Sequence, residues 1–404
     1  MNGQAVAGAG DGAAARSGAG AGAAARSRAG AGSAIGTAEP VLTARDLRVE
    51  FRVRHAGDQP GERPGERRRR GARARAVDGV NLDIHPGEIV ALVGESGCGK
   101  TTLARTLLGL ERPAAGEVRY RGQPIRYSAR ALKAYRRRVQ FVQQDPAGSL
   151  NPRHTVYEAV AEGLRIHRAS APGGDAGDGP GGSSGDRDGP HDEVARVADA
   201  LSRAGLRPPE RFFLRYPHEL SGGQRQRVVI AGALVLGPQV LIADEPVASL
   251  DASVRGEILS LLLRLRDDPG LAALVITHDL GLAWNIADRV AVMYLGRIVE
   301  TGPAEPVLRS PRHPYTHALL SVLPEAGAAA PVILSGEPPD PARIPAGCRF
   351  HVRCPLAASG RVDASRCRTE ELPVLAGGTA AGVACHFPGV PVRGGAEPER
   401  LTPG

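Results

Sequence analysis

A glycine-rich segment of nine residues constrains the fold of this chain more than any other feature. It follows an apolar run at residues 89–93 and precedes a helical run that begins near residue 103. A strand, a glycine turn and a helix start form the setting that a phosphate-binding loop requires, because glycine lets successive backbone N–H groups converge on one anion. The segment fits the pattern G-x-x-x-x-G-K-[ST] and consists of Gly94, Glu95, Ser96, Gly97, Cys98, Gly99, Lys100, Thr101 and Thr102.

The side chains of this phosphate loop suit ATP and Mg²⁺. We expect Lys100 to reach the β- and γ-phosphates and the Thr101 hydroxyl to ligate Mg²⁺, while the helix N-terminus behind them adds partial positive charge. The chain holds 51 lysine and arginine residues, yet only Lys100 and Lys133 are lysine. Because lysine presents a compact point charge where arginine presents a planar fork, the pattern predicts nucleotide binding rather than an ordinary glycine-rich turn.

Further polar groups come directly after strand-like runs. Asp244 and Glu245 follow residues 240–243, and His278 follows residues 274–277. An aspartate at a strand end can hold Mg²⁺ and a neighbouring glutamate can polarise the attacking water, although many strands end in an acid. Strand-like runs that alternate with helical ones, with charged residues after the strands, predict an α/β fold. Its mostly parallel sheet would carry the site along one edge.

Composition and charge exclude several classes of protein. Much of the formal charge of +8 comes from an arginine-rich run, residues 67–75, which we interpret as a solvated loop and alternatively as a contact for nucleic acid or anionic lipid. No run reaches the ~18 apolar residues of a membrane span, since Pro238 and Gln239 interrupt the nearest one. The N-terminus lacks the compact apolar core of a secretory signal. Five cysteines, four of them clustered late, suit a reducing cytosol better than a secreted disulfide scaffold.

A third motif opens a helix, and its glycines would expose backbone N–H groups to an anion behind a good N-cap at Ser221. By itself it could be a plain capped helix start. This signature segment consists of Leu220, Ser221, Gly222, Gly223 and Gln224. Together with the phosphate loop and the acidic strand end, it closely resembles the ATP-binding cassette (ABC) family. Other landmarks of that family match as well: Gln144 its Q-loop glutamine, residues 249–251 its D-loop, His278 its switch histidine and Phe51 its adenine-stacking aromatic residue.

The resemblance covers about residues 40–390 and implies a fold, an activity and an assembly. The fold would be a P-loop NTPase core with a mostly parallel sheet, an antiparallel β subdomain and a helical subdomain. Two such subunits would face each other head to tail around two ATP molecules, and the signature segment of one would close on the ATP of the other. The implied catalytic residues are Glu245, His278 and Gln144. The implied Mg²⁺ ligands are Thr101, Gln144 and Asp244.

The C-terminal region narrows the resemblance. Residues 313–320 resemble part of the C-terminal extension of oligopeptide and dipeptide importer ATPases. Residues 142–146 and 149–153 are similar to the Q-loop sequence of that subfamily. Four cysteines follow at spacings wider than the C-x-x-C pairs of zinc modules: Cys348, Cys354, Cys367 and Cys385. Four thiols among Gly and Pro suit an all-sulfur site for Zn²⁺ or an iron–sulfur cluster, unless they are ordinary free thiols. In the importer subfamily the matching cysteines ligate a [4Fe–4S] cluster, and we expect one here.

The resemblance therefore predicts the ATP-hydrolysing subunit of an importer for dipeptides, oligopeptides or a similar small solute. It would lie peripherally on the cytoplasmic face of the membrane and dock on separate permease subunits through residues 145–158. A second ATPase subunit, identical or different, would complete it, and an extracytoplasmic solute-binding protein would supply the cargo. One alternative is another cargo, such as nickel chelates. Another is a soluble cassette ATPase acting on nucleic acid or ribosomes, which a single cassette without a heptad run disfavours.

We expect four parts along the chain. Residues 1–39 lack large apolar side chains and would form a disordered tail. Residues 40–310 would form the nucleotide-binding domain, with a mainly helical section from residue 156 to about residue 215. Residues 311–390 would form a small cysteine-containing domain, and residues 391–404 a second tail. Flexible inserts, rich in Gly with Pro and Arg or with Asp, are predicted at about 55–74 and 170–190.

Overall fold

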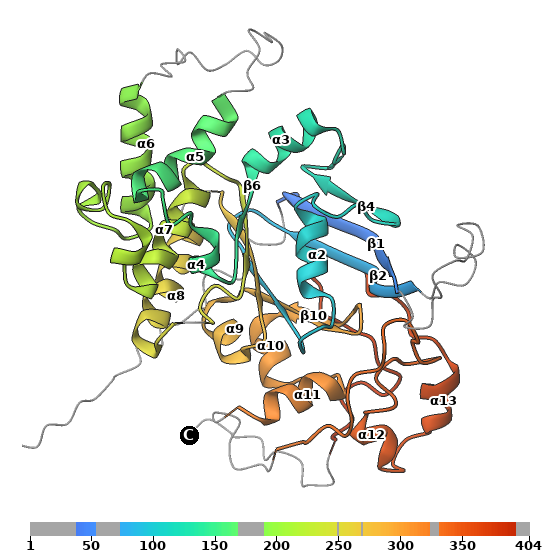
Figure 1. Cartoon of the computed structure of the whole chain (residues 1–404). Coiled ribbons are helices and arrows are strands. Elements are labelled where there is room, and N and C mark those ends of the chain that lie inside the picture. The colour runs from blue at the N-terminus through green and yellow to red at the C-terminus, as the bar shows by residue number, and fades with distance from the viewer. Residues whose placement is uncertain are drawn as a thin grey trace, which may run out of the picture. The chain divides into compact units, whose positions relative to one another are not determined.

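The computed structural model describes residues 38–53, 73–168, 190–248, 250–267, 270–323 and 331–392, all of which belong to one compact unit (Figure 1). Several expectations fall wholly or mostly outside these residues: the two tails, the two inserts, the arginine-rich run and Ser249 of the D-loop. Within the described part of the chain, no helix has both the length and the apolar character needed to cross a bilayer.

The described residues form two sheets, and the larger consists of β3 (Ile89–Val93), β6 (Val139–Val142), β7 (Val240–Asp244), β8 (Ala272–Thr277), β9 (Arg289–Tyr294), β10 (Arg297–Pro303) and β11 (Gly382–Val383). Their order across the sheet is β11-β10-β9-β3-β8-β7-β6. The five strands from β9 to β6 pair in parallel, whereas β10 and β11 are antiparallel. β3, β7 and β8 are buried along their whole length, which explains their unbroken apolar sequences. The predicted mostly parallel sheet is confirmed.

The smaller sheet consists of β1 (Leu42–Arg52), β2 (Arg73–Ile84), β4 (Ala115–Tyr120) and β5 (Gln123–Pro124). All its pairs are antiparallel, in the order β2-β1-β4-β5, as predicted for the β subdomain. Apolar side chains from both sheets meet in one cluster around α2 (Lys100–Leu107), with Leu47, Leu92 and Leu103 among its fully buried members. The helix that follows the phosphate loop is thus held between the two sheets.

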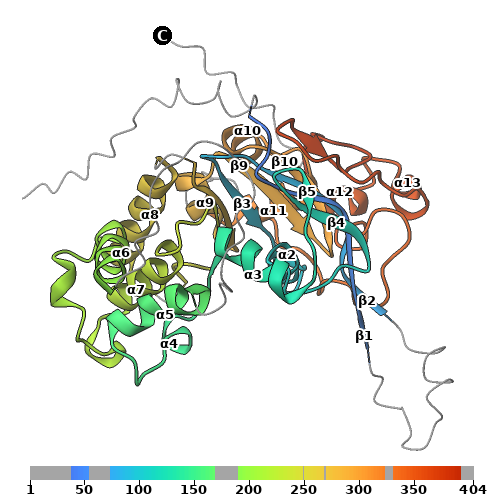
Figure 2. The same ribbon diagram turned by 90° about the horizontal axis from the view of Figure 1, so that it is seen from above.

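A helical group covers the other face of the larger sheet and comprises α4 (Pro146–Ser149), α5 (Val156–Arg168), α6 (Pro190–Arg203), α7 (Gly222–Leu234) and α8 (Ala252–Asp267). It lies on the opposite side from the smaller sheet in both Figure 1 and Figure 2. The helical section predicted to reach about residue 215 is too long. α6 ends at Arg203 because Gly205 adopts a left-handed φ of +84° and two prolines follow at residues 208 and 209. The nucleotide-binding region also contains α3 (Ala129–Arg138) and α9 (Leu280–Ile286).

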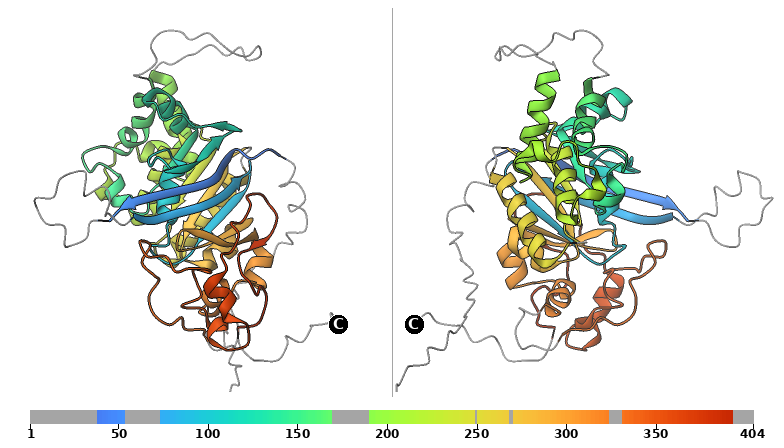
Figure 3. Two further views of the ribbon diagram at one scale, coloured as in Figure 1. Left: turned by 90° about the vertical axis from the view of Figure 1, so that its right-hand side faces the viewer. Right: turned by 60° about the vertical axis from the view of Figure 1, so that its left-hand side comes forward.

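The C-terminal extension, residues 311–323 and 331–392, lies at the end of the unit opposite α5 and α6 (Figure 3). Its helices are α11 (Pro314–Ser321), α12 (Pro355–Ala358) and α13 (Ala364–Thr369), and α10 (Ala304–Arg309) precedes it. The Tyr315 ring lies 4.8 Å from that of Tyr294 on β9 and 5.3 Å from that of Phe350. These three rings belong to one hydrophobic cluster with Val93 of β3. The extension therefore packs on the larger sheet through a shared core.

A buried ion pair joins the beginnings of β3 and β9. Glu88 is fully buried and Arg289 nearly so. Nη1 of Arg289 donates to Oε1 of Glu88 at 2.9 Å and to the carbonyl oxygen of Asp83 at 3.0 Å. The same Glu88 oxygen accepts the backbone N–H of His85 at 2.8 Å. Since both charges are removed from water, each depends on the other to remain buried.

Replacing Arg289 with methionine should therefore destabilise the whole chain. Removing one partner leaves the Glu88 carboxylate buried without its cation, and such changes cost about 3–5 kcal/mol of unfolding free energy. Urea unfolding of Arg289→Met measures this loss. The control is Arg309→Met, which breaks the exposed ion pair with Glu305 and should cost less than about 1 kcal/mol. Equal losses in the two variants would contradict the importance of the buried pair.

Candidate functional site

A cleft of about 570 Å³ at the carboxyl ends of β3, β7 and β8 collects most of the residues predicted for the ATP site. β2 also contributes Ala76, which sequence reasoning did not single out. The predicted residues that line the cleft are Ser96, Gly97, Gly99, Lys100, Thr101, Thr102, Gln144, Asp244, Glu245 and His278. Four segments that lie far apart in the sequence thus meet around one space.

Close backbone contacts require two of the glycines in the phosphate loop. A Cβ on Gly99 would lie 2.1 Å from the carbonyl oxygen of Ala76, and one on Gly94 would lie 2.2 Å from that of Met293. Gly99 also has a φ of +112°, which L side chains rarely adopt. The loop is therefore fitted against the backbones of β2 and β9, and glycine at these two positions permits that fit.

The Lys100 side chain folds back over the beginning of the loop. Its Nζ donates to the carbonyl oxygens of Gly94 at 2.7 Å and Glu95 at 2.8 Å. α2 begins at the same residue, so its free N–H groups lie at this end of the helix. A buried ammonium group beside a helix N-terminus gives the cleft positive charge where phosphate oxygens would bind.

The Thr101 hydroxyl connects the phosphate loop to the end of β7. Its Oγ1 donates to Oδ2 of Asp244 at 2.9 Å. Burial raises the pKa of Asp244 and so does the neighbouring Glu245 charge, while the hydrogen bond from Thr101 and the charge of Lys100 oppose that rise. Two oxygen ligands of the kind that Mg²⁺ prefers therefore lie side by side in the cleft.

Glu245 and His278 form a second connection, between the ends of β7 and β8. Oε1 of Glu245 lies 2.7 Å from Nδ1 of His278 and also accepts the His278 backbone N–H at 3.0 Å. Glu245 has a φ of +49°, which is uncommon for a residue with a side chain. The carboxylate is largely buried, whereas the imidazole is 68% exposed. This arrangement holds one carboxylate at the wall of the cleft beside an accessible histidine.

Several predicted site residues do not line this cleft. Ser221 caps α7, since its hydroxyl accepts the N–H of Gln224 at 3.3 Å and its own N–H donates to the Gln224 side chain at 3.1 Å. Gly222 and Gly223 form the first turn of the same helix. Phe51 is half-exposed near the end of β1.

The side chains of two phosphate-loop residues, Cys98 and Glu95, face away from the cleft. Cys98 is buried under the loop and burial raises the pKa of its thiol. Glu95 forms an ion pair with Arg353. Neither side chain is among those that line the cleft.

The four C-terminal cysteines line a second, small pocket in the extension. Cys348, Cys354 and Cys367 are buried and Cys385 is half-buried. Burial, together with the neighbouring thiols, raises the pKa of Cys348 to about 12 and that of Cys385 to about 11. As the side chains stand, no three His, Cys, Asp or Glu residues of the described ranges are grouped closely enough to hold a metal ion.

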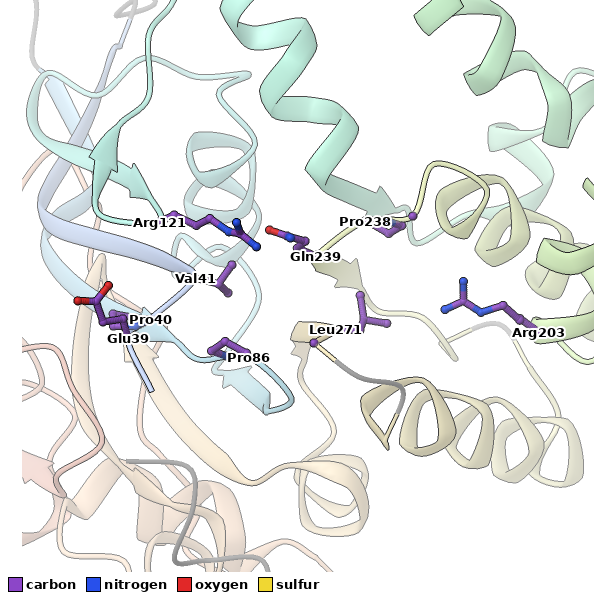
Figure 4. A pocket seen from close by; sticks show the side chains of 11 residues that line it. Glu39, Pro40, Val41, Pro86, Arg121, Arg203, Pro238, Gln239 and Leu271 are labelled. Carbon is purple, nitrogen blue, oxygen red and sulfur yellow. The ribbon is translucent and has the colours of Figure 1, made fainter. Parts of the chain in front are cut away.

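A larger cleft, of about 770 Å³, lies elsewhere (Figure 4). Pro238 and Gln239, which precede β7, and Leu271, which precedes β8, line it together with Arg121 and other residues. It is therefore at the amino ends of these strands. Ligands of parallel α/β sheets bind at the carboxyl ends, so the smaller cleft with the phosphate loop is the better candidate for the functional site.

Sequence reasoning missed the contacts between the phosphate loop and the C-terminal extension. The Tyr315 hydroxyl accepts the backbone N–H of Glu95 at 2.9 Å, and Arg353 binds the Glu95 side chain. Tyr315 lies in the segment 313–320 that resembles the importer extension, whereas no sequence motif includes Arg353. More than 200 residues separate each of them from Glu95, and no local pattern signals such a pairing.

Two family models match the chain. Residues 77–248 match the model described as "ABC transporter". Residues 299–360 match the model described as "Oligopeptide/dipeptide transporter, C-terminal region". The first match includes the phosphate loop and the end of β7, and the second includes α11 and two of the four cysteines, Cys348 and Cys354.

Curated relatives resemble the chain over most of its length. The di/tripeptide transport ATP-binding protein DppF of Pseudomonas aeruginosa is 40% identical over 352 residues, which cover 86% of this chain and 98% of the relative. The glutathione import ATP-binding protein GsiA of Shigella dysenteriae is 46% identical over 289 residues, or 71% of this chain. The chain spans 42% of the length of that second relative.

Solved structures show the same fold. The ATP-binding cassette MJ0796, solved as a dimer in a post-hydrolysis state with ADP and phosphate, is similar with a TM-score of 0.50 and 28% identity. The match covers 65% of this chain and 98% of that one. The P-loop fold predicted from the sequence is thereby confirmed for the cassette part.

Replacing Gly99 with alanine should abolish nucleotide binding, because the added Cβ collides with the Ala76 carbonyl oxygen and displaces the loop. Equilibrium dialysis with labelled ATP measures the effect. Gly122→Ala is the matched control, since Gly122 has a similarly unfavourable φ of +73° but nothing within 4 Å of its Cβ position. That variant should lose about 1 kcal/mol of stability from backbone strain and still bind ATP. Full ATP binding by Gly99→Ala would contradict the fit of the loop.

Proposed function

Because this chain belongs to the ATP-binding proteins of ABC transporters for oligopeptides and dipeptides, we propose that it hydrolyses ATP to drive the import of peptides through separate permease subunits. The observation that carries the proposal is the cleft in which the phosphate loop, Gln144, Asp244, Glu245 and His278 meet. Such a cleft can hold a nucleoside triphosphate by its phosphates and present a carboxylate to water.

The residues of the cleft divide the work of phosphoryl transfer. The loop N–H groups and Lys100 bind the phosphates and stabilise the charge that develops on them. Glu245 polarises the water that attacks the γ-phosphorus, and the bond to the bridging oxygen breaks to leave ADP and phosphate. His278 shares Oε1 of Glu245 and holds that carboxylate in place. We assign the catalytic roles to Glu245, His278 and Gln144.

The described residues also suit Mg²⁺. Thr101 and Asp244 present oxygens that already contact each other, and Gln144 lines the same cleft. Hard oxygen ligands beside bound phosphates are the usual environment of this ion. Mg²⁺ held there would neutralise phosphate charge, and the chain's own part is to fix these oxygens through β7 and the loop.

A second ATPase subunit would complete each site. The signature segment lies outside the cleft, at the N-terminus of α7, where its capped first turn presents backbone N–H groups. Supplied by a partner, this helix end would bind the γ-phosphate and couple hydrolysis to the movement of the subunits. The partner is either a copy of this chain or a related ATPase, and Phe51 is our candidate for stacking on adenine.

The remaining partners follow from family membership. Permease subunits in the membrane would receive the segment 145–158, which includes α4 and the start of α5, and this chain would be peripheral on the cytoplasmic face. A solute-binding protein outside the membrane would deliver the peptide. Nickel chelates as cargo, and a role on nucleic acid or ribosomes, are less favoured, because the relatives are named as peptide and glutathione transport ATP-binding proteins.

We also propose that residues 40–310 form the nucleotide-binding domain and residues 311–390 a small domain with a four-cysteine metal site. What supports the metal site is that all four thiols line one small pocket, although they would have to move closer together than they now stand to hold one ion. A soft cation would stabilise the thiolates that burial now disfavours. A [4Fe–4S] cluster is our first choice and Zn²⁺ the second. A bound cluster would cross-link four segments of the extension.

Glu245→Gln should bind ATP and lose hydrolysis by about 10²-fold or more, since the amide cannot polarise the attacking water. Phosphate release from the purified chain measures turnover, and uptake of a labelled dipeptide by cells that carry the variant should fall with it. The exposed control Glu305→Gln should keep both activities. Undiminished turnover in Glu245→Gln would refute the role of Glu245. If Glu245→Gln loses hydrolysis but cells that carry it take up the dipeptide as well as cells with the wild-type chain, peptides are not the cargo.

Anaerobically purified chain should contain about four irons and absorb broadly in the visible range, as a single cubane cluster does. Cys354→Ser should lose this iron, whereas Cys98→Ser, which changes the one cysteine outside the pocket, should retain it. Metal analysis measures both. Zinc in place of iron would refute the cluster and keep the metal site, and metal-free protein would refute the site.

A further inference from the structure

We propose that Arg353 and Tyr315 of the C-terminal extension are positioning residues for the phosphate loop, and that ATP binding depends on them. The inference rests on the proposed function and adds to it a dependence of the nucleotide site on the extension. Both side chains act on one residue, Glu95, the second of the phosphate loop.

The Arg353 guanidinium binds the Glu95 carboxylate through two hydrogen bonds. Nη1 donates to Oε2 at 2.8 Å and Nη2 donates to Oε1 at 3.3 Å. The Arg353 side chain is 8% exposed and the Glu95 side chain 26%. A bidentate contact of this kind fixes the orientation of the Glu95 carboxylate as well as its distance from Arg353. Because both side chains are largely buried, water screens the ion pair only weakly.

Tyr315 holds the backbone of the same residue. Its hydroxyl oxygen accepts the Glu95 N–H at 2.9 Å. The ring is fully buried and packs on the rings of Tyr294 and Phe350. Since the ring cannot turn without disturbing this cluster, the hydroxyl is a fixed anchor for the first peptide of the loop.

The two contacts reach the phosphate-binding groups through Lys100. The Lys100 ammonium donates to the carbonyl oxygen of Glu95 at 2.8 Å. The N–H, the carboxylate and the carbonyl of Glu95 are thus held by Tyr315, Arg353 and Lys100 respectively. A shift of Glu95 would move both the lysine head and the next loop peptides, which must align with the phosphates.

The position of Arg353 also joins the loop to the cysteine pocket. Arg353 directly precedes Cys354, which lines that pocket. Any change that displaces the segment with Arg353 and Cys354 would therefore also displace Glu95. By linkage, ATP that binds better to the held loop would in turn stabilise the extension.

The test uses the full chain and the affinity for ATPγS with Mg²⁺. Arg353→Gln should weaken binding about ten-fold or more, the scale for losing a charge-assisted contact, and should raise KM for ATP more than it lowers kcat. Arg353→Lys should restore part of the affinity, and Tyr315→Phe should weaken it several-fold. The matched controls are Arg366→Gln, which breaks the exposed pair with Glu370, and Tyr157→Phe, which removes a hydroxyl bound to Glu193. Both should bind ATPγS within about two-fold of the wild type.

If Arg353→Gln does not fold, Glu95→Gln removes the ion pair from the loop side and should weaken binding in the same way. Affinity within two-fold of the wild type in either folded variant would refute the positioning role. Equal losses in the controls would refute it too, because they would show a general effect on folding. A wild-type chain that binds no ATPγS would instead refute the proposed ATPase function itself.

Discussion

The parallel register of β3, β8 and β7 is the constraint on which the site depends. Val93 pairs with Thr277, and Ile276 with Asp244. The residues that follow these strand ends therefore emerge in one row: the phosphate loop after β3, His278 after β8 and Glu245 after β7. β6 continues the row and brings Gln144 to the same edge. Buried apolar strands fix this register because a slip would break the ladder and the packing on both faces.

Arginines join the extension to the cassette. Arg349, nearly buried, donates to the carboxylate of Asp78 and to the Leu295 carbonyl oxygen, and Arg353 binds Glu95. These charge-assisted hydrogen bonds lie around the aromatic cluster that the extension shares with the larger sheet. Buried guanidinium groups require such partners, so these contacts fix the position of the extension beside the phosphate loop. This fixed position is the physical reason why the nucleotide site would depend on residues far along the chain.

Much of the fold could be predicted from local pattern. The apolar runs at β3, β7 and β8 and the glycine turn after β3 predicted a mostly parallel sheet with its site at one edge, and that sheet is present. The predicted helical section reaches beyond Arg203, where Gly205 and two prolines end α6. The shared core of the extension could not be predicted, since Phe350 and Tyr315 carry no sign of their partners on β9.

The sequence by itself determined the nucleotide chemistry of this protein. A phosphate loop is a local structure, set by the glycines, the lysine and the helix start that follow one another in the chain, so its residues can be read in order. Tertiary structure alone decided how the remaining groups meet. Three sets of contacts join residues separated by 33 to 258 positions: Thr101 with Asp244, Glu245 with His278, and Arg353 and Tyr315 with Glu95. Such contacts depend on strand order and core packing, which no single stretch of sequence contains.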